Sequence, residues 1–490
     1  MKYTKTAALA CALLLCAGSV QAADKKQENV LPQRFSDAMT WNLQNRPEDI
    51  TITKVAVPAD HSSQGQPSGE NLPPKPAGEG PMNPPPGGFN PPDHITQGSA
   101  ARNVTESGTL EDQVFGSTGS DENALRITGA AVTLRNVEIM KQEGNSSSTE
   151  GGDFYGMNAA LLATDGAQVT IEDSSVHSSA PNGNGLFSYG KGTKISAKNV
   201  TITTESHNSG GLQTTGGAET EAENVTVFTA GNSSAAIRSD RGGGTVSVKG
   251  GTFRTAGYGS PAIYSTARIS VTGAALSASR SEGAVIEGKN SIDLKDCSLE
   301  GNMADTRVMG SETIKEENVH TVMIYQSMSG DAEEGTSSFS MEGGSLLSHK
   351  GDIFYVTNTA CTIGLSNVKI KNEDPAGAFL RVSGNSASRG WGRAGANGGK
   401  AVFTAKNQKM VGNILVDSIS HLTMTLGKNS DWKGALLQIE NDKGLSKDAG
   451  VDFTIEKGAT WNLTADSTVT TLHNNGKIVT NGHTLTVLKK

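Results

Sequence analysis

Ser234-Ala-Ala-Ile-Arg-Ser-Asp240, followed by the alternating stretch Thr245-Val-Ser-Val248, recurs one repeat later as Ser260-Pro-Ala-Ile-Tyr-Ser-Thr266 and Arg268-Ile-Ser-Val271. Each copy opens with a small residue and an aliphatic one, continues through a turn and then alternates β-branched with polar residues. Alternation with a period of two, interrupted by Gly and Asn corners, is typical of short β-strands. The pair of copies therefore predicts β structure that repeats along the chain.

The same pattern extends well beyond these two copies. Its aliphatic position recurs, mostly 25 or 26 residues apart, at Leu125, Leu161, Leu186, Leu212, Ile237, Ile263 and Val285. The one interval of 36 residues contains a Ser/Gly/Asn insert at 144–152. A period in this range indicates a solenoid.

Each repeat also carries a third short strand, for example Val200-Thr-Ile202 and Val225-Thr-Val227. Three strands per repeat predict an all-β fold, a parallel β-helix of roughly 13 turns, with no helical segments. The pattern continues past residue 300 with insertions, one of which is the Gly/Asn/Arg loop at 383–400 that contains Trp391. We expect each thin coil to hold small and medium side chains rather than large aromatic ones.

The segments before the repeats differ in composition. Residues 1–22 combine Lys2 and Lys5 with a short apolar run and a small-x-small ending at Ala22, which predicts a secretory signal peptide. Residues 23–56 form a weakly patterned N-terminal segment. Eleven of the 16 prolines lie in 57–98, which we interpret as a Pro/Gly-rich linker, either a semi-rigid tether or a spacer without a partner. The β-helix domain is expected over 99–490.

Composition narrows the possible partners. The net charge of −8 argues against nucleic acid, which needs clustered cations. After the signal no apolar stretch is long enough to cross a membrane. Cys297 and Cys361 would remain in the mature chain, two coils apart, and coils spaced about 4.8 Å apart place them beyond the reach of a disulfide. We expect two free, buried thiols.

With these repeats in view, the chain resembles bacterial exported right-handed parallel β-helix proteins with the pectin-lyase-like fold, among them adhesins and autotransporter passengers. The resemblance covers about residues 108–490 and rests on repeats such as 235–248 and on the tail 458–487. That tail is similar to the stem preceding the membrane barrel of autotransporters, and we expect no self-export through a fused barrel here. The resemblance implies use at the cell surface or outside the cell, with the periplasm as an alternative.

Enzymes on this scaffold act mostly on polysaccharides through clustered carboxylates. The sequence contains no Asp-Asp, Gly-His-Gly or Arg-x-Lys, which the hydrolase branch uses, and no His-Glu-x-x-His. Acidic runs occur at 121–122 and 331–334, and we interpret them as solvated loops rather than as Ca²⁺ sites. We expect no catalytic residues, metal or cofactor.

The residue after each aliphatic position, and the residue two further on, should point away from the coil. Stacked coils would then present an exposed ladder along one face. Its aromatic rings suit sugar rings and its arginines suit the carboxylates of acidic sugars. The predicted ligand-binding face comprises Arg126, Phe187, Tyr189, Gln213, Arg238, Asp240, Tyr264, Tyr325, Tyr355 and Arg381.

These features predict an exported, non-catalytic adhesin or surface-binding module for polysaccharide or host glycan. Two alternatives stay open: a lyase or hydrolase of acidic polysaccharide, and a structural envelope component without a specific ligand. The fold hosts both enzymes and adhesins, so it does not choose between them. The oligomeric state is not indicated.

Overall fold

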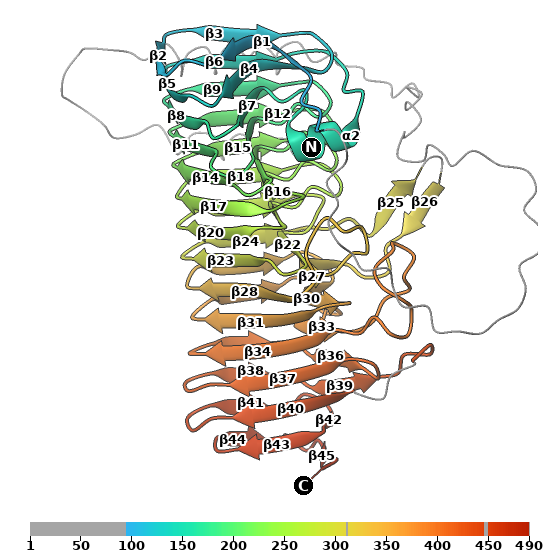
Figure 1. Cartoon of the computed structure of the whole chain (residues 1–490). Helices are drawn as coiled ribbons and strands as arrows, with labels where there is room; N and C mark the ends of the chain where they lie inside the picture. The colour runs from blue at the N-terminus through green and yellow to red at the C-terminus, as the bar shows by residue number, and fades with distance from the viewer. Residues whose placement is uncertain (1–94, 310–311, 445–448, 490) are drawn as a thin grey trace, which may run out of the picture. The chain divides into compact units, whose positions relative to one another are not determined.

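The computed structural model describes residues 95–309, 312–444 and 449–489. The predicted signal peptide, the N-terminal segment and almost all of the linker lie outside these residues. The described residues form a right-handed parallel β-helix, so the predicted fold class is confirmed (Figure 1). Two sheets have 13 and 14 strands, in agreement with the predicted number of turns.

Three long sheets run along the stack and every pairing within them is parallel. Sheet A consists of β1 (Ser99–Val104), β4 (Glu122–Thr128), β7 (Leu161–Thr164), β10 (Leu186–Tyr189), β13 (Leu212–Thr215), β16 (Ile237–Ser239), β19 (Ile263–Ser265), β22 (Ala284–Glu287), β27 (His320–Tyr325), β30 (Asp352–Thr357), β33 (Leu380–Val382), β36 (Ile414–Asp417) and β39 (Leu436–Ile439). Sheet B consists of β2 (Gly108–Glu111), β5 (Ala131–Arg135), β8 (Gln168–Glu172), β11 (Lys194–Lys198), β14 (Ala218–Glu223), β17 (Gly244–Lys249), β20 (Arg268–Thr272), β23 (Ser291–Lys295), β28 (Thr336–Glu342), β31 (Ala360–Ser366), β34 (Lys400–Lys406), β37 (His421–Leu426), β40 (Gly450–Ile455) and β43 (Thr471–Asn474).

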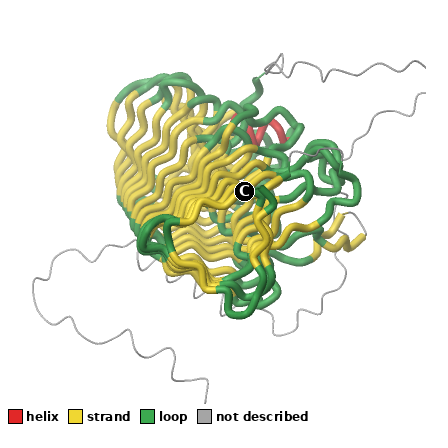
Figure 2. The backbone as a smooth tube through the Cα atoms, turned by 90° about the horizontal axis from the view of Figure 1, so that it is seen from below, coloured by secondary structure: helices red, strands yellow, loops and turns green. Residues whose placement is uncertain are grey.

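Sheet C is shorter, and smaller elements complete the fold. Sheet C consists of β3 (Val114–Ser117), β6 (Glu138–Lys141), β9 (Ser175–Ser178), β12 (Thr201–Thr204), β15 (Thr226–Thr229), β18 (Thr252–Thr255), β21 (Ala275–Ala278), β24 (Ser298–Gly301), β29 (Ser345–Ser348) and β32 (Lys369–Asn372). The smaller sheets are formed by β35 (Lys409–Val411), β38 (Asp431–Lys433), β41 (Thr460–Asn462) and β44 (Lys477–Val479), by β42 (Ser467–Val469) and β45 (Leu485–Val487), and by the antiparallel hairpin of β25 (Thr306–Met309) and β26 (Glu312–Lys315). Seen along the stack, the strands of successive coils superpose, and the helix and most long loops lie on one side (Figure 2).

The interior of sheet A follows the aliphatic repeat with one correction. Leu212 pairs with Ile237, and Ile237 pairs with Ile263, as the spacing predicts. The partner of Ile263 is Ala284, however, not Val285. Val285 therefore points away from the coil, and Ile286 is fully buried in its core. The shorter interval of 22 residues misplaced the repeat by one position, which reverses every side chain of a strand.

A column of Asn and Asp residues turns the chain from sheet B into sheet C. Asn199 and Asn224 have φ values of 53° and 54°, in the left-handed region that Asn and Asp tolerate best after Gly. Their side chains also bond along the stack: Asn224 Nδ2 donates to Asn199 Oδ1 at 2.9 Å, and Asn199 Nδ2 donates to Asp173 Oδ1 at 2.9 Å. The corner residues therefore supply both the bend and a hydrogen-bonded ladder.

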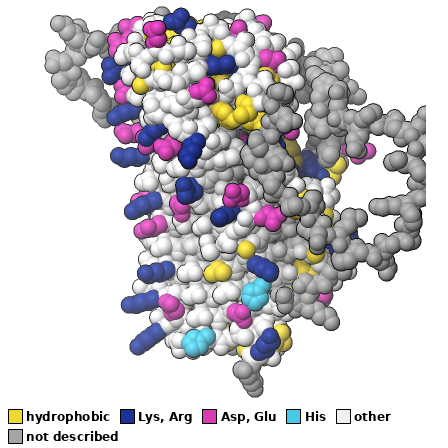
Figure 3. Space-filling view, viewed as in Figure 1, with side chains coloured by type: hydrophobic (Ala, Val, Ile, Leu, Met, Phe, Trp, Pro, Cys, Tyr) yellow, Lys and Arg dark blue, Asp and Glu magenta, His cyan; other side chains and the backbone are white. Residues whose placement is uncertain are grey.

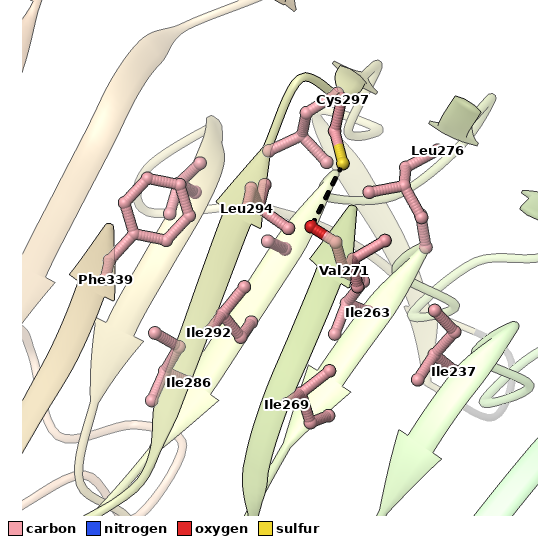
Figure 4. Packing of buried hydrophobic residues seen from close by; sticks show 14 of the residues in the cluster. Ile237, Ile263, Ile269, Val271, Leu276, Ile286, Ile292, Leu294, Cys297 and Phe339 are labelled. Carbon is pink, nitrogen blue, oxygen red and sulfur yellow. Dashed lines mark hydrogen bonds between the residues drawn. The ribbon is translucent and has the colours of Figure 1, made fainter. Parts of the chain in front are cut away.

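The interior holds large aromatic residues in its C-terminal half, contrary to our expectation. Phe354 lies 5.6 Å from Phe339 and 5.8 Å from Phe379, between ring centroids, and Trp432 and Trp461 stack at 5.0 Å. All five side chains are buried. In the preceding coils the side chains that fill the interior are mainly aliphatic, as Figure 4 shows between Ile237 and Phe339, although Phe253 on β18 is also fully buried. Only the two tryptophans stack face to face, whereas the phenylalanine rings meet tilted or edge to face, and both arrangements are favourable for aromatic pairs.

Both described cysteines are buried and free, and they lie on coils two layers apart. Cys297 Sγ donates to the carbonyl of Val271 at 3.3 Å (Figure 4). Burial raises the pKa of Cys361 to about 12, so this thiol is protonated at neutral pH. Within the described part of the chain, no helix is long and apolar enough to span a bilayer.

Candidate binding site

The outer face of sheet A is where the sequence places its ligand-binding ladder, and much of that ladder is covered. Four predicted residues, Arg126, Tyr189, Tyr264 and Arg381, are half-buried. The other six are buried: Phe187, Gln213, Arg238, Asp240, Tyr325 and Tyr355. The expected exposed ladder is therefore wrong. Its side chains do leave the coil interior, but inserted segments pack over them.

The first cover is the one described helix, α2 (Thr149–Tyr155), which our sequence analysis did not predict. Ser148 caps its N-terminus by accepting a hydrogen bond from Gly151 N at 2.9 Å. Gly156 ends it with a φ of 80°, and a Cβ at that position would lie 2.5 Å from Leu162 Cδ1. The Ser/Gly/Asn insert thus contains the caps of a short helix that rests on sheet A.

A buried ion cluster lies beneath α2. Arg238 Nη2 lies 3.1 Å from Asp153 Oδ2 and 2.8 Å from Asp240 Oδ2. Burial raises the pKa of Asp240 to about 7 despite the opposing charge of Arg238, and Asp153 and Asp331 add to the rise. Burial likewise raises the pKa of Asp153. Arg238 and Asp240, predicted to face a ligand, instead attach α2 to the coil.

The other ladder residues that contact α2 also hold this helix against sheet A. Gln213 Nε2 donates to the carbonyl of Asp153 at 2.9 Å, and Phe187 packs with Leu162 in a small apolar cluster. Tyr189 meets Tyr155 edge to face at 5.6 Å. These predicted ladder residues therefore stabilise the helix that covers them.

A second covered cluster surrounds Glu287. Tyr325 donates to Glu287 Oε2 at 2.7 Å, and the hydroxyls of Tyr264 and Ser327 also donate to this carboxylate. Three donors satisfy a carboxylate that is only 2% exposed. Tyr264 and Tyr325 are thereby occupied within the protein.

The two predicted arginines at the ends of the ladder are also engaged. Arg126 Nη2 donates to the carbonyls of Gln97 and Ser99 at 2.6 and 2.9 Å. Burial lowers the pKa of Arg126. Arg381 Nε donates to Asp352. Both cations fix neighbouring segments.

The ladder also borders a cavity of about 320 Å³ outside β27 and β30. Its walls come from the β25–β26 hairpin with the residues after it, and from the 383–399 loop (Figure 1). Tyr355 is the only predicted ladder residue that lines it. The lining consists of Arg307, Ile314, Lys315, Glu316, Glu317, Asn318, His320, Tyr355, Ser386, Ser388, Arg389 and Trp391.

Hydrogen bonds join the two walls. Glu317 accepts from Ser386 N at 2.8 Å and from Ser386 Oγ at 2.7 Å. Arg389 Nη1 lies 3.5 Å from Glu316 Oε2 and its guanidinium covers the Trp391 ring at 4.6 Å. The hairpin side and the loop side are thus tied together around the cavity.

The floor contains a buried histidine with a defined proton position. Asn318 Nδ2 donates to Asp352 Oδ2 at 2.8 Å, so the Asn318 carbonyl faces His320 Nδ1 at 2.9 Å and accepts its proton. His320 Nε2 lies 3.6 Å from Glu282 Oε1 and has no hydrogen-bond partner among the described residues. Burial alone would raise the pKa of Glu282, but His320 outweighs it and lowers that pKa to about 2.

Sequence reasoning missed every other residue that lines this cavity. Apart from His320, which lies at the start of β27, they lie in the two insertions that interrupt the repeat, between β24 and β27 and between β33 and β34. The only signal in the sequence that could have indicated this cavity is the interruption of the repeat, because insertions in a solenoid often lie on its binding face. Figure 3 shows that cationic and acidic side chains are interspersed over the face it views.

No protein-family model matches the chain, and a search of curated proteins finds no match. No group of three or more His, Cys, Asp or Glu gathers as a metal site within the described ranges.

Proposed function

We propose that this chain is an exported, non-catalytic β-helix that acts as an adhesin or surface-binding module and holds a sugar of a polysaccharide or host glycan in the cavity between the β25–β26 hairpin and the 383–399 loop. The resemblance to adhesins and autotransporter passengers with the pectin-lyase-like fold favours this use. The cavity carries the proposal. It combines the rings of Tyr355 and Trp391 with charged and amide side chains, the mixture that orients small ligands in proteins.

The rest of the outer face supports this location. The other predicted ligand residues are engaged by α2, by Glu287, by Asp352 or by backbone carbonyls, so they have little polar capacity left for a sugar. The cavity volume of about 320 Å³ lies at the lower end of the range for small-ligand sites, roughly 300–1,000 Å³.

A glycan array with the full chain tests the proposal. We expect binding to a restricted set of glycans, and Trp391→Ala should abolish it. The matched control is Phe228→Ala, which removes an aromatic ring that is 42% exposed on sheet C, away from the cavity. Equal binding by Trp391→Ala and the parent would refute this site.

A parallel assay for reducing ends and unsaturated products separates binding from turnover. Binding without product supports the module proposed here. Product formation would establish the polysaccharide lyase or hydrolase instead. If the chain neither binds a glycan nor forms a product, the remaining alternative is a structural envelope component without a specific ligand.

A further inference from the structure

The charges that line the cavity are unbalanced. Three cationic side chains, Arg307, Lys315 and Arg389, stand against two acidic ones, Glu316 and Glu317. Both carboxylates are already engaged: Tyr258 donates to Glu316 at 2.6 Å, and Ser386 donates twice to Glu317. The acidic groups therefore have limited capacity to attract a cationic or neutral ligand.

Two of the cations have no acidic partner. Among the residues that the structure describes, no carboxylate forms an ion pair with Arg307 or Lys315, and the buried Arg307 Nε has no acceptor. An unsatisfied buried N–H is costly, and a guanidinium next to a cavity is well suited to a planar carboxylate. His320, only 2% exposed, lies in the same wall, but its Nε2 already faces Glu282 Oε1 at 3.6 Å, so the free cationic groups are Arg307 and Lys315.

The walls also limit how much of a glycan can enter. The hairpin side and the loop side are joined through Glu317 and Ser386 and through Glu316 and Arg389. A polymer running through the site would have to pass this connection. A volume of about 320 Å³ accommodates a single small unit rather than a chain segment.

We propose that the cavity takes the terminal residue of a glycan, a sugar that carries a carboxylate, with Arg307 and Lys315 as its anion-binding groups. This inference rests on the proposed function and deepens it by naming the ligand class and the end-on mode. The carboxylate would pair with Arg307, and the sugar ring would lie against Tyr355 and the edge of Trp391. The chain end could belong to an acidic polysaccharide or to a host glycan, since both present the same chemistry.

Calorimetry with matched monosaccharides tests the proposal. Glucuronic acid and glucose differ only in the C6 carboxylate, and glucose 6-sulfate carries a different anion at that position. We expect the full chain to bind glucuronic acid at least about tenfold more tightly than either of the other two. Arg307→Gln and Lys315→Gln should each weaken glucuronic acid binding, by about tenfold for the former. Arg254→Gln removes an exposed cation on sheet C and should leave binding unchanged.

The length of the ligand tests the end-on mode. A tetramer of glucuronic acid should bind with the affinity of the monomer and with one chain per protein. Affinity that rises steeply with length would overturn the end-on mode. Equal binding of glucose, equal binding of glucose 6-sulfate, no binding of glucuronic acid, or full binding by Arg307→Gln would each overturn the carboxylate assignment.

These failures differ from a failure of the proposed function. If array binding depends on Trp391 but the bound glycans are neutral, the function stands and this inference falls. If no glycan binding depends on Trp391, the proposed site itself falls.

Discussion

Replacing Arg238 by Met tests whether α2 is held in place by the buried ion cluster. Met matches the unbranched stem of Arg as far as Nε and carries no charge, so the substitution removes the guanidinium and keeps the packing of the stem. The side chains of Arg238, Asp153 and Asp240 are 10%, 12% and 6% exposed. The variant would leave two carboxylates facing each other out of water.

The expected loss is large because one partner of a buried pair is removed while the other charges stay. Such a change costs about 3–5 kcal/mol. The cluster lies between α2 and sheet A, so we expect the loss to appear as local opening of α2 rather than as unfolding of the stack. A change of that size corresponds to roughly two to four orders of magnitude in the opening equilibrium.

Hydrogen exchange of the amides in residues 149–156 measures this opening. Exchange there should be much faster in Arg238→Met and unchanged in the C-terminal coils. Adding Asp153→Asn and Asp240→Asn should restore part of the protection, because the unpaired charges are then gone. Arg135→Met is the matched control: Arg135 also pairs with two carboxylates, Glu111 and Glu172, but it is 54% exposed, and its loss should change nothing measurable. Equal exchange in Arg238→Met and the parent would refute the role of the cluster.

Three further predictions concern the stack and its pH dependence. Phe379→Ala removes the middle of an aromatic column and should lower the free energy of unfolding by about 3–5 kcal/mol, measured by urea denaturation, whereas a loss below about 1 kcal/mol would contradict the packing described. Asn224→Ala should cost about 1–2 kcal/mol because its φ of 54° is unfavourable for Ala, and Asn224→Gly should cost less; the reverse order would show that the bend is not the cause. The pKa of Asp240 is raised to about 7 in the folded state, so the folded protein binds this proton more tightly than the unfolded chain does. Protonation of Asp240 therefore stabilises the fold fully below about pH 4, and this stabilisation is lost as the pH rises through about 7. Asp240→Asn should therefore flatten the fall in thermal midpoint between pH 5 and pH 8, and an unchanged slope would count against this carboxyl group.

The sequence predicted the parts of the molecule that repeat. Alternation at positions such as Ile237 and Ile263 determines which side chains enter the coil, because a one-residue shift would expose them. The same rule placed Arg238 and Tyr264 outside the coil, and the structure agrees. Where the interval shortened, at Val285, the same reasoning failed by one position.

The segments that cover the outer face could not be predicted from the periodic pattern. The helix α2 and the 383–399 loop each occur once, so their conformations depend on individual caps and contacts rather than on a period. Ser148 and Gly156 are helix-capping residues, but a helix of seven residues is too short to be predicted from its own propensity. The cavity could not be predicted for the same reason, because its walls are two insertions that meet only in the folded chain.

Tryptophan fluorescence gives the most direct test of the central claim that the cavity is the binding site. Trp432 and Trp461 are fully buried inside the coils, whereas Trp391 lines the cavity. Titration of the full chain with glucuronic acid should give a saturable change in emission, and Trp391→Phe should remove that change. An identical change in Trp391→Phe, or none in the parent while calorimetry records binding, would place the ligand elsewhere.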